Sequence, residues 1–352
     1  MIKEKIREKA LNNEIFTKEE ILELITLLKE GEKDFIYELA DETRKHFMGD
    51  KVYLRGIIEF SNYCRKSCLY CGINSKVKDV KRYRIDEQEI IDACHNLKSN
   101  GQTTVVLQSG EDVTFTKERF GELLKRIKKE TELAITVSVG ERDKETYRYW
   151  KESGMDRYLL RFETTNKKVF KAIHPDDDLE YRLDCIKTLK ALGVQTGSGF
   201  MIGLPETDDN DLANDIAKCR ELDLDMIGVG PFISHPETDL KDKVIASNID
   251  IDFITGVIAI LRITNQEAHI PATTAFDAVV SYNGRQLALK RGANVFMPNS
   301  TPKKYRKDYQ LYPDKPCVDE GADDCSNCVL GRILSIGREI GKGPGHSIKG
   351  SG

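Results

Sequence analysis

The chain alternates between short apolar runs rich in β-branched residues and longer segments whose apolar residues recur at helical spacing. The segments between the runs include the ranges 86–100, which ends at Gly101, and 179–192, which ends at Gly193. Parallel strands need a crossover of roughly a dozen or more residues, so this alternation predicts parallel strands joined by helices. The eight runs begin near Val52, Thr103, Ala134, Arg157, Gln195, Met226, His269 and Ala293.

The number of strands predicts an α/β fold built as a full (β/α)8 TIM-type barrel over residues 51–300. This region has the length of about 250 residues that is typical of such barrels. Residues 1–50 are expected to form an N-terminal helical cap, with a capping box from Thr17 to Glu20. Residues 301–352 form a C-terminal extension, and we expect its glycine-rich tail, Gly341 to Gly352, to be poorly ordered.

The charge of the chain is nearly balanced, with 54 basic and 58 acidic residues and a formal net charge of −4. No long block of one sign occurs, which argues against nucleic acid or a membrane surface as the main partner. The N-terminus has no apolar core of a secretory signal and no run near the ~20 apolar residues of a membrane-spanning helix. We therefore expect a cytoplasmic protein.

Cysteine usage changes this picture, because six of the nine cysteines fall into two tight clusters. An odd number in clusters argues against a disulfide framework and favours metal ligation in a reducing compartment. The other three, Cys94, Cys185 and Cys219, lie in helical patterns and are expected to be buried as small hydrophobic residues.

The first cluster, Cys64, Cys68 and Cys71, comes directly after the first predicted strand. Three thiolates can hold a four-iron cluster and leave one iron open to a small molecule. A structural zinc knuckle or three unrelated buried thiols are the alternatives. Zinc sites usually have four ligands, and no histidine lies between Gly49 and His95.

This spacing, with the aromatic–Cys pair Tyr70–Cys71, resembles the signature of the radical S-adenosylmethionine (SAM) superfamily. The resemblance implies that the open iron chelates SAM and that one electron cleaves SAM to methionine and a 5'-deoxyadenosyl radical. Residues 109–111 resemble the Gly-Gly-Glu motif, with Ser in place of the first Gly, and residues 199–206 resemble the adenine-side motif. The SAM-binding residues implied in this way are Tyr70, Ser109, Gly110, Glu111, Ser138, Glu163, Arg182, Gly203 and Met226, the last of which is also explained as a core gap-filler.

Polar residues follow several predicted strands, where a barrel places its active site. Arg161 and Glu163 are two residues apart and should point to the same side of one strand, while Asn299 follows the eighth strand. A buried charge without a partner costs several kcal/mol, so Arg161 and Glu163 need each other or a ligand.

Longer phrases over Lys51 to Leu330, such as RGIIEFSNYCRKSCLYCG and DMIGVGPFISHPETDL, resemble the HydE family of [FeFe]-hydrogenase maturases. That resemblance implies radical attack on the sulfur of a cysteine-ligated Fe(CO)2CN complex. It also implies HydG as the supplier of that complex, HydF as the scaffold that receives the product, and a reductant such as ferredoxin or flavodoxin. The substrate contacts expected from it are Gln108, Thr136, Arg161, Thr273, Thr274, Tyr305 and Tyr309.

The second cluster, Cys317, Cys325 and Cys328, lies in the C-terminal extension. It predicts a second iron–sulfur cluster, of the [2Fe–2S] or [4Fe–4S] type, with zinc or free thiols as alternatives. His174 and His235 each precede a proline in a loop and are expected to be structural.

Two other functions stay open at this point. One is a radical SAM mutase or synthase of the methylornithine synthase and biotin synthase group. The other is a non-catalytic iron–sulfur carrier or scaffold, which predicts neither binding nor cleavage of SAM.

Overall fold

The computed structural model describes residues 2–241, 243, 250–280, 283–315, 318 and 322–349, with the backbone alone over 322–327. The helices are α1 (Ile2–Leu11), α2 (Lys18–Lys29), α3 (Lys33–Met48), α4 (Glu87–Ser99), α5 (Lys117–Thr131), α6 (Lys144–Glu152), α7 (Lys167–Ile173), α8 (Leu179–Ala191), α9 (Asp209–Glu221), α10 (Ile251–Thr264), α11 (Thr274–Val279), α12 (Gly284–Lys290), α13 (Lys303–Arg306) and α14 (Ala322–Leu334). The strands are β1 (Lys51–Leu54), β2 (Gly56–Ser61), β3 (Thr104–Ser109), β4 (Ala134–Ser138), β5 (Met155–Leu159), β6 (Gln195–Ser198), β7 (Met201–Ile202), β8 (Met226–Ile227), β9 (Gly230–Pro231), β10 (Pro271–Ala272), β11 (Val295–Phe296) and β12 (Glu339–Ile340).

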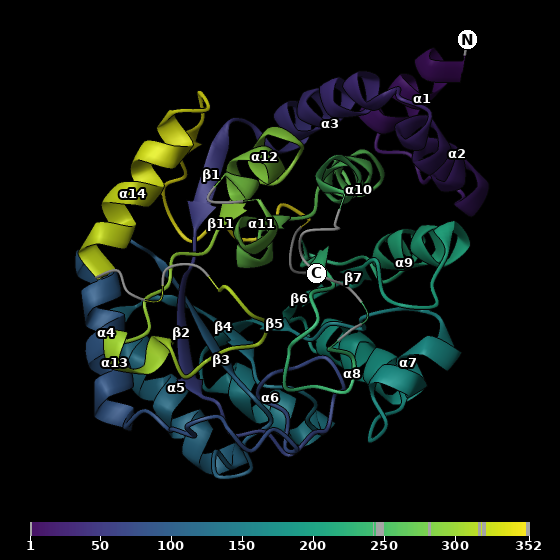
Figure 1. The fold of residues 1–352 in the computed structure, drawn as a ribbon. Helices are drawn as coiled ribbons and strands as arrows, with labels where there is room; N and C mark the ends of the chain where they lie inside the picture. Colours follow the sequence, from purple (N-terminus) through teal and green to yellow (C-terminus); the bar gives the residue numbers. More distant parts are fainter. Residues whose placement is uncertain are drawn as a thin grey trace.

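The strands form parallel sheets inside a ring of helices (Figure 1). One sheet has six strands in the order β2-β3-β4-β5-β6-β8, and another has the order β10-β11-β1-β12. Isolated parallel bridges join β2 to the chain after β11, at Ile57 and Asn299, and β8 to the chain before β10, at Met226 and His269. The fold is therefore TIM-barrel-like, as predicted, while complete closure of eight strands stays a prediction.

The predicted strands and helices agree with the structure in place and order. Each predicted apolar run contains at least one strand, although Arg55 interrupts the first run between β1 and β2. Helices α4 and α8 begin and end within one residue of the predicted ranges. Gly101 and Gly193 follow them with positive φ values of 74° and 70°, which a side chain would disfavour.

The N-terminal helices pack on one side of the barrel, against α9 and α10 (Figure 1). The predicted capping box is present, because Thr17 accepts from the backbone of Glu20 and Glu20 accepts from the backbone of Thr17. Helices α2 and α10 approach closely at Gly256, where a Cβ atom would lie 2.4 Å from the side chain of Leu28. This close contact fixes the cap against the barrel.

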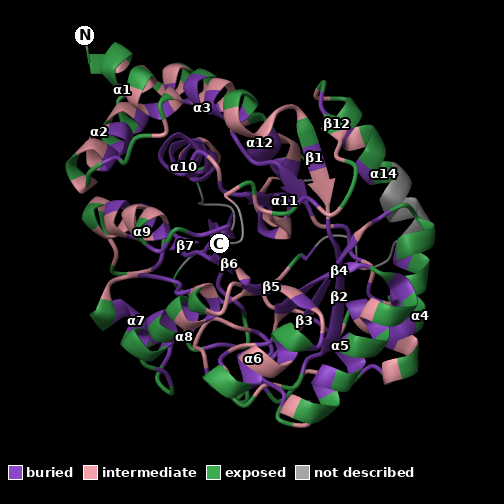
Figure 2. Ribbon diagram, turned by 180° about the vertical axis from the view of Figure 1, so that it is seen from behind, coloured by how far each residue is buried: buried purple, intermediate pink, exposed green. Residues whose placement is uncertain are grey.

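Burial follows the expected pattern, with exposed residues on the outer faces of the helices and buried residues facing the strands (Figure 2). Cys94, Cys185 and Cys219 are all buried, as predicted. In the part of the chain that is described, no helix combines the length and the apolar character needed to cross a membrane.

The C-terminal segment differs from its prediction. Strand β12 pairs in parallel with β1. The residues that follow, up to 349, pack at the N-terminal ends of the strands. Arg55 donates to the carbonyl of Gly345 at 3.1 Å, and Arg157 donates to that of Pro344 at 2.8 Å. The expectation of a poorly ordered tail is wrong for residues 341–349, because buried arginines need acceptors and the tail supplies them.

Candidate active site

A cavity of about 370 Å³ lies at the C-terminal ends of the strands. The cysteines of the first cluster, Cys64, Cys68 and Cys71, lie on one wall, and Arg161 and Glu163 also line the cavity. Most of the other residues predicted to bind SAM or substrate face the same space: Tyr70, Gln108, Ser109, Gly110, Glu111, Thr136, Ser138, Arg182, Met226, Thr273, Thr274 and Tyr309.

The cysteine loop is held in a fixed shape by its own neighbours. The side-chain amide of Asn74 donates to the carbonyls of Cys68 and Cys71 at 3.0 and 2.8 Å. The backbone N–H of Glu111 points at Sγ of Cys64 at 3.4 Å. A Cβ atom on Gly110 would meet the carbonyl of Tyr63 at 2.4 Å, so only glycine allows the end of β3 to approach the loop this closely.

The donor set fits an iron–sulfur cluster. Burial, together with the nearby Cys64 thiol, raises the pKa of the Cys71 thiol to about 12. Burial and the two neighbouring thiols also raise the pKa of Cys68. Three free thiolates so close together would repel one another. Binding to the iron of one cluster stabilises the thiolate form of all three.

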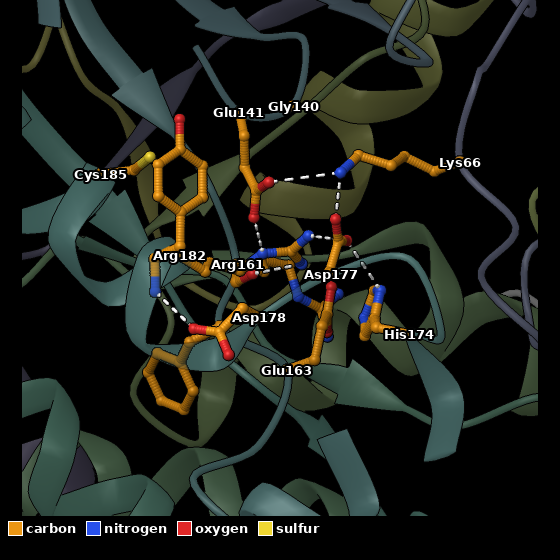
Figure 3. Close-up of polar contacts among 12 residues, drawn as sticks. Lys66, Gly140, Glu141, Arg161, Glu163, His174, Asp177, Asp178, Arg182 and Cys185 are labelled. Carbon is orange, nitrogen blue, oxygen red and sulfur yellow. Dashed lines mark hydrogen bonds and ion pairs between the residues drawn. The ribbon is translucent and has the colours of Figure 1, made fainter. Parts of the chain in front are cut away.

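Figure 3 shows a network of buried charges that includes Lys66 of the cysteine loop. Arg182 donates to Oε1 of Glu141 at 2.8 Å and to Oδ2 of Asp177 at 2.6 Å. Lys66, from within the cysteine motif, pairs with Asp177 and lies 3.4 Å from Oε2 of Glu141. Two cations and two carboxylates therefore neutralise one another in a place that water scarcely reaches.

These contacts set the ionisation of the network. Burial alone would raise the pKa of Asp177, but hydrogen bonds from His174 and Lys66 and the charge of Arg182 hold that pKa well below its usual value. Burial alone would lower the pKa of Lys66, yet the bond to Asp177 and the nearby carboxylates raise it. Asp177 and Lys66 thus stay charged near neutral pH.

Arg161 and Glu163 do meet, as predicted, with Nη2 and Oε2 at 2.8 Å. The two groups are not aligned as a hydrogen bond, and Oε2 of Glu163 and Nε of Arg161 have no hydrogen-bond partner among the described residues. Glu163 also has a φ of 66°, in the left-handed region that side chains other than glycine seldom adopt. Strain and unused polar atoms indicate a ligand site at this pair.

Two predicted residues lie elsewhere. Tyr305 donates to Oε2 of Glu89 on α4 at 3.0 Å and stacks on Tyr83, outside the cavity. Gly203 lies in a loop on the outer side of the barrel near Asp208. Both predictions came from resemblance to family patterns, and neither residue lines the cavity.

The second cysteine cluster is described only in part. Cys317 lies outside the described residues, and Cys325 lies in α14 where only the backbone is described. Cys328, on the same helix, is exposed.

Several residues of the site were not predicted. Lys66 lies within the cysteine motif, and His174 lies near it in space. Glu141 and Asp177 complete the charge network. Lys315 comes from the C-terminal extension and pairs inside the cavity with Glu59 of β2. The position of Lys66 between two cysteines was the one signal in the sequence that pointed to these residues.

Comparisons with known proteins agree with this site. Residues 58–219 match the radical SAM superfamily. The chain is 44% identical over 327 residues to the [FeFe] hydrogenase maturase subunit HydE of Thermotoga maritima, covering 93% of this chain and 92% of that protein. It is 29% identical over 293 residues to the 3-methylornithine synthase of Methanosarcina acetivorans, covering 82% of this chain and 81% of that protein.

Solved structures support the fold. The crystal structure of methylornithine synthase (PylB) has a TM-score of 0.82 at 26% identity and covers 96% of this chain and 97% of that one. The crystal structure of HydG, a maturase of the [FeFe]-hydrogenase, has a TM-score of 0.79 at 18% identity and covers 96% of this chain and 75% of that one. The identity to the Thermotoga protein extends over nearly the whole of both chains, and the chain therefore belongs to the radical SAM superfamily and, within it, to the HydE family of [FeFe] hydrogenase maturases.

Proposed function

We propose that this chain is a radical SAM enzyme that acts in assembly of the catalytic metal cofactor of [FeFe]-hydrogenase. The observation that carries this proposal is the identity of 44% to a HydE maturase together with three thiols that line one cavity with Arg161 and Glu163. Cys64, Cys68 and Cys71 would hold a [4Fe–4S] cluster. When bound, that cluster supplies the electron and the open iron with which SAM is cleaved to a 5'-deoxyadenosyl radical.

The protein's own part is to bind and orient the two ligands and to exclude water. Oε2 of Glu163 pairs with Arg161 but accepts no hydrogen bond from the described residues, so it suits the amino or ribose groups of SAM. The guanidinium of Arg182 is paired with Glu141 and Asp177. We therefore assign to Arg182 the role of supplying positive charge next to the cavity and of holding these two carboxylates in place. The other residues assigned to SAM are Tyr70, Ser109, Gly110, Glu111, Ser138 and Met226.

For the substrate we propose a cysteine-ligated iron dicarbonyl cyanide complex, with radical attack at its sulfur. Buried polar atoms without partners support a polar guest in the cavity, namely Oγ1 of Thr136 and Nε of Arg161. Both atoms can form hydrogen bonds with carboxylate, carbonyl or cyanide groups of the substrate once neighbouring side chains move to admit it. The other residues assigned to substrate are Gln108, Thr273, Thr274 and Tyr309.

Partners and compartment follow from this role. HydG would supply the complex, HydF would receive the product, and ferredoxin or flavodoxin would supply the electron, all in the cytoplasm. For Cys317, Cys325 and Cys328 we propose a second iron–sulfur cluster, supported by the exposure of Cys328 and by the spacing of the three residues.

We also propose that the chain has three parts, with boundaries at residues 50 and 300, and that the barrel closes fully. Helix α3 ends at Met48 and β1 begins at Lys51, which supports the first boundary. The bridges at Ile57–Asn299 and Met226–His269 support closure, because they connect the two main sheets at both edges.

The test is anaerobic reconstitution with iron and sulfide, followed by addition of dithionite and SAM and measurement of 5'-deoxyadenosine. We expect deoxyadenosine from the wild type and none above background from Cys68→Ser. A wild type that holds its cluster but makes no deoxyadenosine would favour an iron–sulfur carrier. Hydrogenase activity in a deletion strain tests the pathway separately, and an intact hydrogenase would favour the methylornithine synthase group.

A further inference from the structure

One short segment holds residues 66–69 of the cysteine loop. It consists of Ile173, the last residue of α7, and the four residues that follow it. The two stretches run in opposite directions, and each residue of the loop from 66 to 69 has its own contact. The backbone N–H of Leu69 donates to the carbonyl of Ile173 at 2.9 Å, and that of Ser67 donates to Oδ2 of Asp176 at 2.8 Å. The four contacts join Lys66 to Asp177, Ser67 to Asp176, Cys68 to His174 and Leu69 to Ile173.

Within this segment, the two ring nitrogens of His174 contact different side chains of the site. Its Nδ1 lies 3.2 Å from Sγ of Cys68 and 3.4 Å from Oδ2 of Asp177. Its Nε2 lies 3.3 Å from the hydroxyl of Tyr70, and that hydroxyl lies 3.3 Å from Oε1 of Glu163. A chain of polar contacts therefore leads from a cysteine sulfur to the carboxylate that we assign to SAM.

The imidazole cannot turn freely. Its side chain is 1% exposed, and its ring stacks on Phe170 with the centroids 4.7 Å apart and an interplanar angle of 23°. Tyr70 covers another side with an edge contact at 5.4 Å. The backbone is fixed as well, because His174 ends α7 and Pro175 follows it.

The partners decide where the hydrogen lies. Once Cys68 is a metal-bound thiolate, both groups that face Nδ1 are acceptors, since the other is the carboxylate of Asp177. Nδ1 therefore carries a hydrogen that faces both acceptors, whether the Tyr70 hydroxyl gives its single hydrogen to Nε2 or to Oε1 of Glu163.

We propose that His174 is a positioning residue that donates an Nδ1–H hydrogen bond to the Cys68 thiolate and thereby raises the reduction potential of the iron–sulfur cluster. The inference rests on the proposed function, because it requires Cys68 to ligate that cluster. A donor to a ligating sulfur stabilises the reduced cluster more than the oxidised one, since reduction adds one negative charge. The electron comes from the reductant, and no proton needs to move.

Three substitutions separate the two sides of the ring. In His174→Asn the amide nitrogen can take the place of Nδ1 and keep the bond to Cys68. In His174→Gln the longer amide reaches the place of Nε2 and keeps the contact with Tyr70, but it leaves the sulfur without its donor. His174→Ala removes both contacts.

The readout is the midpoint potential of the reconstituted, SAM-free protein in a redox titration followed by electron paramagnetic resonance. We expect the Gln and Ala variants to have a more negative midpoint, with the ratio of reduced to oxidised cluster about fivefold lower at the wild-type midpoint, the size expected for one hydrogen bond. The Asn variant should stay close to the wild type. His95→Gln is the control, because this histidine of α4 is exposed beside Glu130, and the midpoint of the variant should not change.

A second measurement needs no substitution. Pulsed resonance on the reduced wild type labelled with nitrogen-15 histidine should show coupling of one histidine nitrogen to the cluster. Absence of that coupling, or equal midpoints in the wild type, Gln and Ala proteins at equal iron content, would overturn the role of His174. A protein that assembles no [4Fe–4S] cluster would instead contradict the proposed function.

Discussion

The two ends of the barrel bury positive charge in different ways. At the C-terminal ends of the strands, Lys66 and Arg182 are paired with the carboxylates of Glu141 and Asp177. Burial alone would lower the pKa of Arg182, but the two carboxylates raise it. Each of these four charges has a side-chain counter-charge.

At the N-terminal ends the arginines have backbone acceptors instead. Arg157 donates to the carbonyl of Pro344, and Arg55 donates to that of Gly345. No carboxylate of the described residues lies within ion-pair distance of Arg55 or Arg157. Burial lowers the pKa of Arg157 to about 10.

The difference separates two tasks. Opposite charges in a buried network hold side chains in fixed positions, and such preorganisation suits a site that must bind SAM and a polar substrate. Backbone carbonyls give a buried cation acceptors without adding charge, so they suit a segment that packs on the end of the barrel, although Nε of Arg55 and Nη1 of Arg157 have no hydrogen-bond partner among the described residues. We therefore expect substitutions at the first end to change chemistry and those at the second end to change mainly stability.

The largest effect should come from Cys68→Ser. The change is close to isosteric, so the fold should persist, but a hydroxyl is a poor replacement for a thiolate on iron. We expect formation of 5'-deoxyadenosine to fall to background and the cluster to be lost from the first site. Iron and sulfide content and the deoxyadenosine assay measure this, and a fully active serine variant would contradict the assignment of the three cysteines.

Arg182→Met should be the most destabilising of the substitutions considered. It leaves Glu141 and Asp177 buried with Lys66 as the one remaining cation of the network, and breaking a buried pair costs about 3–5 kcal/mol. Urea unfolding of the reconstituted protein measures the loss, and SAM binding should weaken as well.

The matched control is Arg126→Met, which removes an exposed pair with Glu130 on α5. Exposed pairs contribute about 0.5 kcal/mol or less, so this variant should unfold almost like the wild type. Equal losses from Arg126→Met and Arg182→Met would mean that the buried network does not stabilise this end of the barrel.

Much of this arrangement was predictable from the sequence, because it depends on local rules. The strands follow from the apolar runs, and the limits of α4 and α8 follow from their caps and from the glycines after them. The cysteine loop follows from the spacing of its three cysteines. Arg161 and Glu163 were expected to need each other or a ligand, and the structure places them 2.8 Å apart.

The remainder depends on contacts between distant parts of the chain. His174 looked like an ordinary residue before a proline, and only the packing of residues 173–177 on the cysteine loop brings it to Cys68. The tail looked disordered because glycine-rich sequence lacks side chains to bury, yet its carbonyls are what Arg55 and Arg157 require. Tyr305 was assigned to the substrate from the family resemblance, which does not fix the direction of a side chain.

The base of the barrel offers a smaller and purely structural test. Gly345 has a φ of 55°, and a Cβ atom there would lie 2.5 Å from the ring of Tyr53. Gly345→Val should force the tail away from the arginines and cost about 1–3 kcal/mol, as overpacking usually does. Formation of deoxyadenosine per bound cluster should stay within about twofold of the wild type, since neither Gly345 nor Tyr53 lines the cavity.

Gly343→Val is the control for this change. Gly343 also has a positive φ, 77°, but a Cβ atom there would meet nothing within 4 Å. Both variants carry the backbone strain of a left-handed position, and only Gly345→Val adds the clash. A similar loss of stability in both would show that conformation rather than contact with Tyr53 holds the tail.

The smallest effect should come from Thr17→Ala, which lies outside both ends of the barrel. Thr17 accepts the backbone N–H of Glu20 in the capping box of α2, and losing such a cap costs about 1 kcal/mol. Thr26→Ala is the matched control, because its hydroxyl donates to the carbonyl of Leu22 within the same helix and caps nothing. Urea unfolding should therefore separate the two variants, while deoxyadenosine formation should be unchanged in both. A loss of activity in Thr17→Ala at full cluster content would mean that the cap formed by α1 to α3 influences the cavity, and the division of tasks between the two ends would then be incomplete.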